Sequence, residues 1–576
     1  MEATLETILG ISQVDQPVNI ANEFRGILQT KNYTTFEIYS DTGALLHSFI
    51  GAKLANKCLP GDHISWKDDK CILELRDEHP KIVGTIEYTN KSKYGITSRG
   101  IPMYLFTPYN KAYPHFVVGS SEKNTRKNQI AVIRFDKWSQ LQTFPRGNII
   151  QLLGISGEYN AEYQALLWQA CPHTYPKYQY VAQKSRDVVP RVYLSGYTFN
   201  IDPAGCKDVD DVFTIEEVNK SEWKITITIS DVACYVEDGT AIDIMASLIG
   251  QTLYDLEGIV QRSMLPCEYS EKTCSLLPNK ESYGISFQIL WDVDKQQVVS
   301  EKWFESTFTV DRSYTYEEFQ EEKDSQYAVL LRDIICSIDK IKVVDSHKLV
   351  EYMMILYNKK AGAMLKHSGM GILRRHSSNK EKLEKLEKLE KLEEAGIENI
   401  KELMYSAAEY CLSEDENTIH YGLETDTYAH ATSPIRRYAD LVNQRIIKKI
   451  ITRQNERYIV PITMYDMNLR EKNNKRFKRD LFFLHAVFED TEQKINGVII
   501  NHKKKDDGIL KVSIYIPVWK RIISALYVIS TDKDNTVWSR DEKREIDVTI
   551  GNKVEIKYGF QLSLRNWKER VIFSIL

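Results

Sequence analysis

The chain crowds four carboxylates into ten residues, and this crowding constrains how the surrounding segment can fold. The four are Asp202, Asp208, Asp210 and Asp211. On a straight strand Asp208 and Asp210 would share one face while Asp211 pointed to the other. All four can therefore converge only if the chain turns between them. Pro203 and Gly205 supply residue types that favour such a turn.

Converging carboxylates favour a cation. Without one they repel each other and raise each other's pKa, and a hard divalent cation relieves this cost. Magnesium favours this chemistry, because it takes a few carboxylates, retained waters and phosphate oxygens. One or two such ions can activate water and shield charge during hydrolysis of a phosphodiester. A calcium-binding loop is excluded because no register places its Asp, Gly and Glu ligands correctly. A solvated acidic turn stays open as the alternative.

Length and composition indicate several globular domains. With 576 residues and a hydrophobic share of 43%, the chain is too long for one core, so we expect about three or four domains. A run of ~20 uncharged apolar residues is absent, so we expect no membrane span. The first six residues lack the pattern of a signal peptide. Nine cysteines without a CxxC pair suggest reduced thiols, in cytoplasm or nucleus.

Charge permits nucleic-acid binding without requiring it. The net charge of −4 argues mildly against a protein that coats nucleic acid. Basic residues are nevertheless dense at 436–449 and 470–479. Each stretch could equally be a solvated helix face.

The first part of the chain reads as β-rich. Strands are predicted at 63–66, 81–88 and 130–135, separated by Gly, Asn and Pro turns. Aromatic and basic residues mix at 91–94 and through 104–113. Small barrels that stack bases use such mixtures. Alternatively, these tyrosines form the barrel core.

From about Arg186 the pattern becomes mixed α/β. A half-buried strand is predicted at 223–230, paired with 212–215 across the polar turn 219–222. Helices are predicted at 346–365 and 434–451. Residues 382–393 repeat Lys-Leu-Glu, which predicts a solvated amphipathic helix inserted for structure only. Strands at 511–516, 554–557 and 570–575 suggest another small barrel.

A second informative segment precedes the predicted helix at 434–451. Ser433 is a good N-cap and Pro434 suits the first helical position. Arg436 and Arg437 in the first turn oppose the helix dipole unless an anion docks there. Free N–H groups and a guanidinium fork would then cradle a phosphate. The alternative is an intrahelical pair of Arg436 with Asp440.

Together the two segments resemble the catalytic domain of the ribonuclease II and ribonuclease R family, the RNB family, and most closely its eukaryotic exosome branch. The family's acidic signature, Asp-Pro-x-x-x-x-Asp-x-Asp-Asp, stands at 202–211, and its arginine signature stands at 432–441. Further likenesses follow in order at 84–86, 144–147, 229–236, 264–266, 274–276, 345–351 and 373–376.

The resemblance implies a multidomain α+β fold, with OB-type β-barrels flanking a central mixed α/β RNB catalytic domain. The expected division is a first cold-shock-like OB barrel at 1–78, a second at 79–175, the RNB catalytic domain at 186–490 and a C-terminal OB-fold RNA-binding domain at 491–576.

The resemblance also implies an activity, namely processive 3′→5′ hydrolysis of single-stranded RNA to nucleoside 5′-monophosphates with magnesium. By position, Asp202, Asp208 and Asp211 match metal ligands, and Asp210 matches the residue essential to the attack. Arg436 matches the residue that holds the scissile phosphate.

Three further residues are expected to bind RNA. Tyr254 resembles the aromatic that clamps the terminal base, and Tyr316 resembles another tyrosine that contacts substrate. A stacked base contributes about 1–3 kcal/mol. The alternative for both is a place in the core. Arg437 is expected to contact the RNA phosphates.

Three departures from the family limit this comparison. Lys478 stands where the bacterial enzymes carry a glutamate, and the segment between 331 and 345 is short, so a second clamping aromatic is not assigned. The sequence in front of the first barrel leaves no room for an endonuclease domain. Exosome association is therefore left open, and we expect a monomer.

Two other functions compete with exonucleolytic hydrolysis. The chain could be an inactive RNA-binding protein on the same scaffold, although all four aspartates and Arg436 are present. A nucleotidyl transferase could also use clustered aspartates, but the chain has no Gly-rich lysine loop to cradle a triphosphate.

Overall fold

The computed structural model describes residues 23–40, 43–76, 80–176, 180–185, 187–376, 408–454, 456–490, 493–504, 509–529, 536–538, 544–561 and 570–576. They belong to two compact units, one formed by 1–165 and 561–570 and the other by 166–560 and 571–576. The helical insertion predicted at 382–393 lies outside the described residues. Among the helices described, none combines the length and apolar character needed to cross a membrane.

The first unit begins with an antiparallel sheet in the order β3-β2-β1-β4-β5. Its strands are β1 (Phe24–Thr30), β2 (Thr35–Tyr39), β3 (Leu45–Ile50), β4 (His63–Lys67) and β5 (Lys70–Leu75). Leu28, Phe36, Ile38 and Ile64 alternate with less buried neighbours and fill one side of the sheet. The predicted strand at 63–66 is confirmed.

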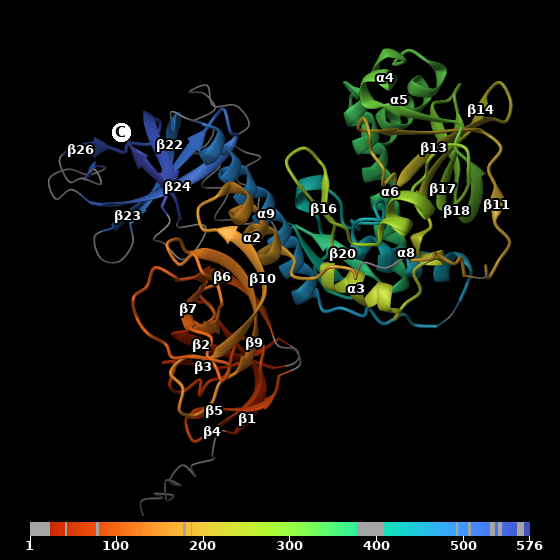
Figure 1. Ribbon diagram of the computed structural model, residues 1–576. Helices are drawn as coiled ribbons and strands as arrows, with labels where there is room; N and C mark the ends of the chain where they lie inside the picture. Colours follow the sequence, from red (N-terminus) through yellow and green to blue (C-terminus); the bar gives the residue numbers. More distant parts are fainter. Residues whose placement is uncertain are drawn as a thin grey trace, which may run out of the picture. The chain divides into compact units, whose positions relative to one another are not determined.

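A closed barrel follows in the same unit, in the order β10-β8-β7-β6-β9 (Figure 1). Its strands are β6 (Lys81–Ile86), β7 (Met103–Pro108), β8 (Phe116–Gly119), β9 (Gln129–Lys137) and β10 (Arg146–Ile155). Phe106 and Tyr109 lie inside, so the core alternative holds for these two aromatics. The Tyr109 hydroxyl accepts a hydrogen bond from Arg570 (2.9 Å), which also pairs with the buried Glu162 (2.8 Å).

The second unit is built on a seven-stranded sheet in the order β11-β18-β17-β14-β13-β12-β19. The strands are β11 (Val192–Tyr193), β12 (Tyr197–Asp202), β13 (Asp211–Glu217), β14 (Glu222–Ser230), β17 (Glu281–Asp292), β18 (Gln297–Thr309) and β19 (Arg312–Thr315). The predicted hairpin of β13 with β14 is confirmed, including its turn. The half-buried character predicted for 223–230 is wrong beyond Lys224, because Thr226 and Thr228 are also buried.

Those threonines are buried because polar partners meet them on the sheet. The Gln288 amide donates to the Thr226 hydroxyl (2.8 Å), and Thr228 shares a hydrogen bond with Ser286 (2.7 Å). Because of such polar side chains, a strand that is buried on both faces has the sequence pattern of a strand with one solvent-exposed face. The sheet therefore forms the centre of the unit.

The helices α4 (Tyr316–Glu321), α5 (Gln326–Asp339), α6 (Ser346–Ser368) and α8 (Tyr438–Ile451) contact this sheet. The second unit also contains α3 (Ala241–Ile249) and α9 (Met464–Glu489), whereas α2 (Tyr159–Ala170) begins in the first unit and ends in the second. The Tyr357 hydroxyl on α6 donates to the Ile285 carbonyl on β17 (3.1 Å), which holds α6 to the sheet. The helix predicted at 346–365 is confirmed.

Smaller sheets complete the second unit. Two antiparallel pairs join β15 (Leu253–Tyr254) with β16 (Val260–Arg262) and β20 (Ile372–Arg375) with β21 (Glu409–Leu412). A five-stranded sheet in the order β24-β23-β22-β27-β28 follows. Between β24 and β27 in the sequence, β25 (Thr536–Trp538) and β26 (Glu545–Asp547) form a separate two-stranded sheet. The strands of the five-stranded sheet are β22 (Lys494–Lys504), β23 (Ile509–Ile516), β24 (Arg521–Val528), β27 (Lys553–Phe560) and β28 (Val571–Ile575). Ile575 donates its N–H to the Tyr527 hydroxyl (2.7 Å), which links the two edge strands.

The predicted start of the helix at 434 is wrong. Residues 434–436 form a turn, Arg437 is the N-cap, and α8 begins at Tyr438. Ser433 does not cap the helix: its hydroxyl accepts a hydrogen bond from the Arg436 guanidinium (2.9 Å), and its N–H donates to the Asp440 carboxylate (2.8 Å). Both arginines therefore precede the helix and are placed by the turn.

Candidate active site

Two neighbouring strands place the first and last of the four aspartates. Asp202 ends β12 and Asp211 begins β13, and these strands pair antiparallel. The loop between them turns at Gly205, whose φ of 77° favours glycine. Cys206 closes the turn by donating its N–H to the Pro203 carbonyl (3.1 Å). The turn predicted between the aspartates is confirmed.

The rest of this loop is held by the segment at 275–276. Val209 donates its N–H to the Ser275 hydroxyl (3.0 Å), and Leu276 donates its N–H to the Val209 carbonyl (2.9 Å). Asn200 donates its side-chain amide to the Leu276 carbonyl (3.0 Å). These bonds fix the backbone that carries Asp208 and Asp210.

The structure brings Asp210 to Arg436, which is 226 positions later in the sequence. One Asp210 oxygen accepts the Ile435 N–H (3.0 Å), and the other accepts the Arg436 Nε–H (3.2 Å). Arg436 also donates to the Ser433 hydroxyl (2.9 Å). Asp210 is only 4% exposed, whereas the Arg436 side chain is 39% exposed. Arg436 can therefore hold Asp210 and still present N–H groups outward.

Burial governs the charge of this cluster. It raises the pKa of Asp210 to about 7, although the Arg436 guanidinium opposes the rise. Burial likewise raises the pKa of Asp202 to about 6, with a contribution from the charge of Asp208. The pKa of Asp211 lies well above its usual range, because of burial first and the charges of Asp202 and Asp210 next.

Two of the carboxylates fit a cation. Asp202 and Asp211 each keep a buried oxygen, Oδ2, without a hydrogen-bond partner among the described residues. Magnesium binds to one or two carboxylates together with water and substrate phosphate. In the described part of the chain, three or more His, Cys, Asp or Glu side chains do not gather as a metal-holding group. The site thus offers two acidic ligands directly.

Asp208, the third predicted ligand, is engaged differently. Its Oδ2 accepts a hydrogen bond from the Tyr254 hydroxyl (2.5 Å), and its Oδ1 lies 3.7 Å from the Cys206 thiol. The role of Asp208 as a metal ligand stays a prediction. No local sequence pattern predicts this bond, because Tyr254 lies in a separate hairpin.

The other predicted contacts with RNA lie around this cluster. Tyr316 is the first residue of α4, and its ring stacks on His347 with centroids 3.8 Å apart. Arg437 donates to Asp440 (2.8 Å) and to the Thr432 hydroxyl (3.3 Å), and its side chain is mostly buried. Asp440 therefore pairs with Arg437 instead of Arg436. The stacking of His347 on Tyr316 was not predicted, because the two residues are far apart in the sequence.

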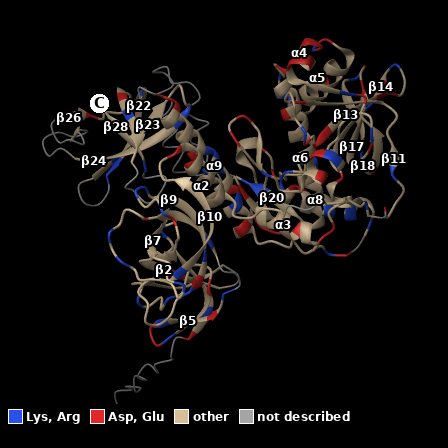
Figure 2. Ribbon diagram, in the orientation of Figure 1, with Lys and Arg blue, Asp and Glu red and all other residues tan. Residues whose placement is uncertain are grey.

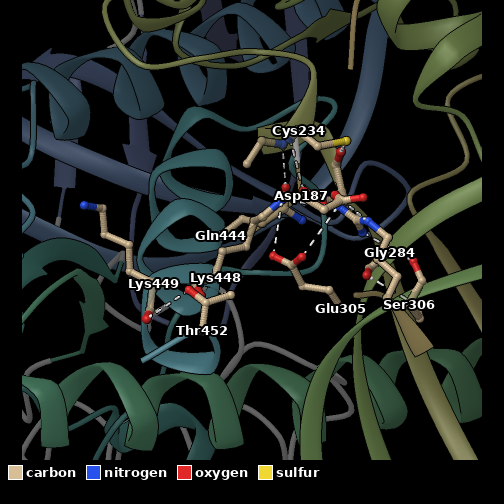
Figure 3. Close-up of polar contacts among 12 residues, drawn as sticks. Asp187, Cys234, Gly284, Glu305, Ser306, Gln444, Lys448, Lys449 and Thr452 are labelled. Atoms are coloured by element: carbon tan, nitrogen blue, oxygen red, sulfur yellow. Dashed lines mark hydrogen bonds and ion pairs between the residues drawn. The ribbon is translucent and has the colours of Figure 1, made fainter. Parts of the chain in front are cut away.

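A buried charge cluster anchors α8 and thereby the arginine turn (Figure 3). The Lys448 ammonium and the Arg191 guanidinium both bind Asp231 Oδ2, at 2.5 and 2.6 Å. Glu305 on β18 lies 3.5 Å from Lys448 and 3.8 Å from Arg191. One turn earlier, Gln444 bonds to the Ser230 carbonyl (2.7 Å). A solvated basic face is therefore excluded for Lys448, although basic and acidic residues mix over both units elsewhere (Figure 2).

Comparison with known proteins identifies a domain of this chain. A model of the RNB domain matches residues 192–340 and 322–453, and a model of the Dis3-like cold-shock domain 2 matches residues 103–171. The chain contains an RNB domain. The first match covers the aspartates and the arginine turn, and the second covers most of the closed barrel.

Curated relatives of this RNB protein are named as exonucleases or ribonucleases. The probable exosome complex exonuclease RRP44 of Caenorhabditis elegans is 25% identical over 462 residues, which is 64% of this chain and 48% of that protein. Ribonuclease R of Buchnera aphidicola is 25% identical over 502 residues, 71% of this chain and 67% of that protein. The chain spans about half the length of the RRP44 relatives that it matches.

Solved structures share the fold of this RNB protein. Mycoplasma genitalium RNase R, in complex with ribose-methylated single-stranded RNA, has a TM-score of 0.69 at 17% identity and covers 96% of this chain and 100% of its own. Yeast Ssd1, a pseudonuclease, has a TM-score of 0.63 at 15% identity, covering 93% and 82%. A pseudonuclease thus shares this fold, so the fold by itself does not indicate catalysis, and only the residues of the site can.

Proposed function

We propose that this chain is a metal-dependent exoribonuclease that hydrolyses single-stranded RNA processively, 3′→5′, to nucleoside 5′-monophosphates. One observation carries the proposal. Asp210 is hydrogen-bonded to an arginine that remains partly exposed, while Asp202 and Asp211 keep buried oxygens without partners beside it. A merely structural acidic turn would expose its carboxylates to water or pair them.

The proposed ion is magnesium. Asp202 and Asp211 would hold it, and Asp208 would join them if the Tyr254 hydroxyl released its oxygen. When bound, a divalent cation activates water and shields the charge of the phosphoryl group. The support for this assignment is the carboxylate chemistry of the site and the two unpartnered oxygens.

Arg436 and Asp210 would act on the substrate directly. The outward N–H groups of Arg436 bind the oxygens of the scissile phosphate, because a guanidinium fork matches phosphate geometry. Asp210 Oδ2 accepts the proton of the attacking water, and its pKa of about 7 suits proton transfer near neutral pH. The Arg436 side chain couples these two tasks by contacting both groups.

RNA would be held by Tyr254, Tyr316 and Arg437. Tyr316 presents an aromatic surface already stacked on His347, and a base can extend such a stack. We propose that the cold-shock-like barrels at 1–78 and 79–175, the catalytic domain at 186–490 and the OB fold at 491–576 share the RNA strand. We further propose a monomer that acts in cytoplasm or nucleus. The names of the RRP44 relatives suggest the exosome as a partner to test.

The alternative is a catalytically inactive RNA-binding protein on the same scaffold. The likeness of the fold to the pseudonuclease Ssd1 is the observation that favours it. The two functions differ in one property, which is whether bound RNA is cut.

The test uses purified protein and 5′-labelled single-stranded RNA with a free or a blocked 3′ end. We expect a ladder of products shortened from the 3′ end with magnesium, and intact RNA with a chelator or a blocked 3′ end. A DNA strand of the same sequence is the control that tests whether cleavage requires ribose. Products shortened from the 5′ end would refute the direction, and RNA that is bound but uncut would favour the inactive alternative.

A further inference from the structure

A small cavity lies beside the first turn of α8 in the second unit. Its walls include Gly250, Arg437, Tyr438, Met467, Arg470 and Glu471. Its free space accommodates about one water molecule or an ion of similar size. Among these six residues, Arg437 alone has a role in the proposed function.

Two guanidinium groups line this cavity with unsatisfied donors. Arg437 Nε and Arg470 Nη1 are both buried, and neither has a hydrogen-bond partner among the residues that the structure describes. A buried N–H group without a partner is unfavourable, and such groups are rare in folded proteins. Two of them on one cavity therefore point to a shared acceptor.

The charge of the walls favours an anion over water. The charge of Arg437 is balanced by Asp440 (2.8 Å), whereas Arg470 forms no ion pair within the described residues. Glu471 is already paired with Arg374 (2.5 Å) and Lys475 (2.9 Å). The N-terminal turn of α8 adds the positive end of its dipole. Asp466 interacts electrostatically with Arg470 without forming an ion pair, so it offsets the charge of Arg470 only in part and a net positive charge faces the cavity.

The fold holds Arg470 in this place. Gly250 ends α3 with a φ of 77°, and a Cβ atom there would lie 2.7 Å from Arg470 Cδ. The arginine stem therefore packs directly over the glycine backbone. Burial lowers the pKa of Arg470, which is the expected effect of a charge that has lost water without gaining a full partner.

We propose that this cavity binds a small monovalent inorganic anion, chloride, between Arg437 Nε and Arg470 Nη1. The bound ion accepts hydrogen bonds from both guanidinium groups and offsets the charge of Arg470. Phosphate and carboxylate ligands are excluded by size. Neither the site nor its test depends on the proposed nuclease activity.

The anion would steady two segments that form the candidate active site. Thr252 donates its N–H to the Arg436 carbonyl (3.0 Å), and Tyr438 donates its N–H to the Gly250 carbonyl (2.9 Å). Tyr254, two residues beyond Thr252, bonds to Asp208. The cavity is lined by Gly250, Arg437 and Tyr438, which lie at these two backbone hydrogen bonds. An ion there would therefore hold the arginine turn against the strand that carries Tyr254.

Thermal unfolding of the full chain without RNA tests the site. At constant ionic strength and neutral pH, sodium gluconate is replaced stepwise by sodium chloride. We expect the unfolding midpoint of the wild type to rise by about 2 °C or more, with saturation. Arg470→Met, which keeps the length of the stem, loses this rise. Lys472→Met, on the exposed side of the same helix, keeps it.

An equal rise in Arg470→Met, or no rise in the wild type, would overturn the proposal. If Arg470→Met does not fold, crystals of the wild type grown with bromide give an independent answer. We expect an anomalous peak between Arg437 and Arg470. Density for water at that position, without anomalous signal, would overturn the proposal as well.

Discussion

Replacement of Asp210 by asparagine is expected to lower the rate of RNA cleavage by about 10²- to 10⁴-fold, the usual contribution of a positioned acid or base. The amide cannot take the proton of the attacking water. The fold should survive, because the Asn side-chain oxygen can still accept the Ile435 N–H, and a buried carboxylate with a raised pKa is removed. Affinity for RNA should be retained, since one negative charge beside the phosphate is lost.

The measurement is single-turnover cleavage of end-labelled RNA under magnesium saturation, with binding measured separately. Asp324→Asn is the matched control, because that exposed aspartate lies outside the cluster. Unchanged cleavage by Asp210→Asn would show that proton transfer takes place elsewhere. A parallel loss of RNA affinity would instead indicate a damaged surface.

Replacement of Lys448 by methionine is expected to lower the free energy of unfolding by about 3–5 kcal/mol, the cost of leaving a buried ion without its partner. Asp231 and Glu305 are almost fully buried, and without Lys448 they share the single guanidinium of Arg191. Like charges then lie close together in a medium that screens them poorly.

Lys449 is the control for this prediction, because it lies next to Lys448 but points away from the cluster (Figure 3). It pairs with Glu456, which is 85% exposed, so Lys449→Met should change stability by only about 0–1 kcal/mol. Unfolding in urea compares the two variants. Equal midpoints for Lys448→Met and Lys449→Met would mean that the buried cluster contributes little net stability.

The acidic turn and much of the sheet could be predicted from sequence because local rules govern them. The alternation in 223–230 and the polar turn at 219–222 predict the hairpin, and glycine at 205 predicts the turn. These features depend on neighbours a few residues apart. The two family signatures likewise lie in short segments.

Long-range partners limited the remaining predictions. Pro434 favours a helix start, but Thr252 pairs with the Arg436 backbone and Asp440 accepts the Ser433 N–H, so the chain turns before the helix begins. Lys448 has the sequence signature of a solvated residue, and its ion pairs with Asp231 and Glu305 explain its burial. The contacts of Thr252 with Arg436 and of Asp231 with Lys448 join segments that are far apart in the sequence, and they leave no trace in local composition.

The proposed reaction requires Asp202 and Asp211 to hold a cation. Because burial raises the pKa values of these carboxylates, the stability of the protein depends on pH. In the metal-free protein the pKa of Asp202 is about 6 and that of Asp210 about 7, above the usual 3.8. The folded state then binds these protons more tightly than the unfolded chain. Their stabilising contribution is complete at low pH and is lost as pH rises through the folded values, between about pH 4 and pH 7.

The most direct test is therefore the shift in thermal unfolding midpoint that magnesium causes at about pH 5 and about pH 7.5. We predict a larger shift at the higher pH for the wild type and for Asp324→Asn, and none for the double variant Asp202→Asn, Asp211→Asn. An equal magnesium shift in the double variant, or no shift in the wild type, would contradict the account.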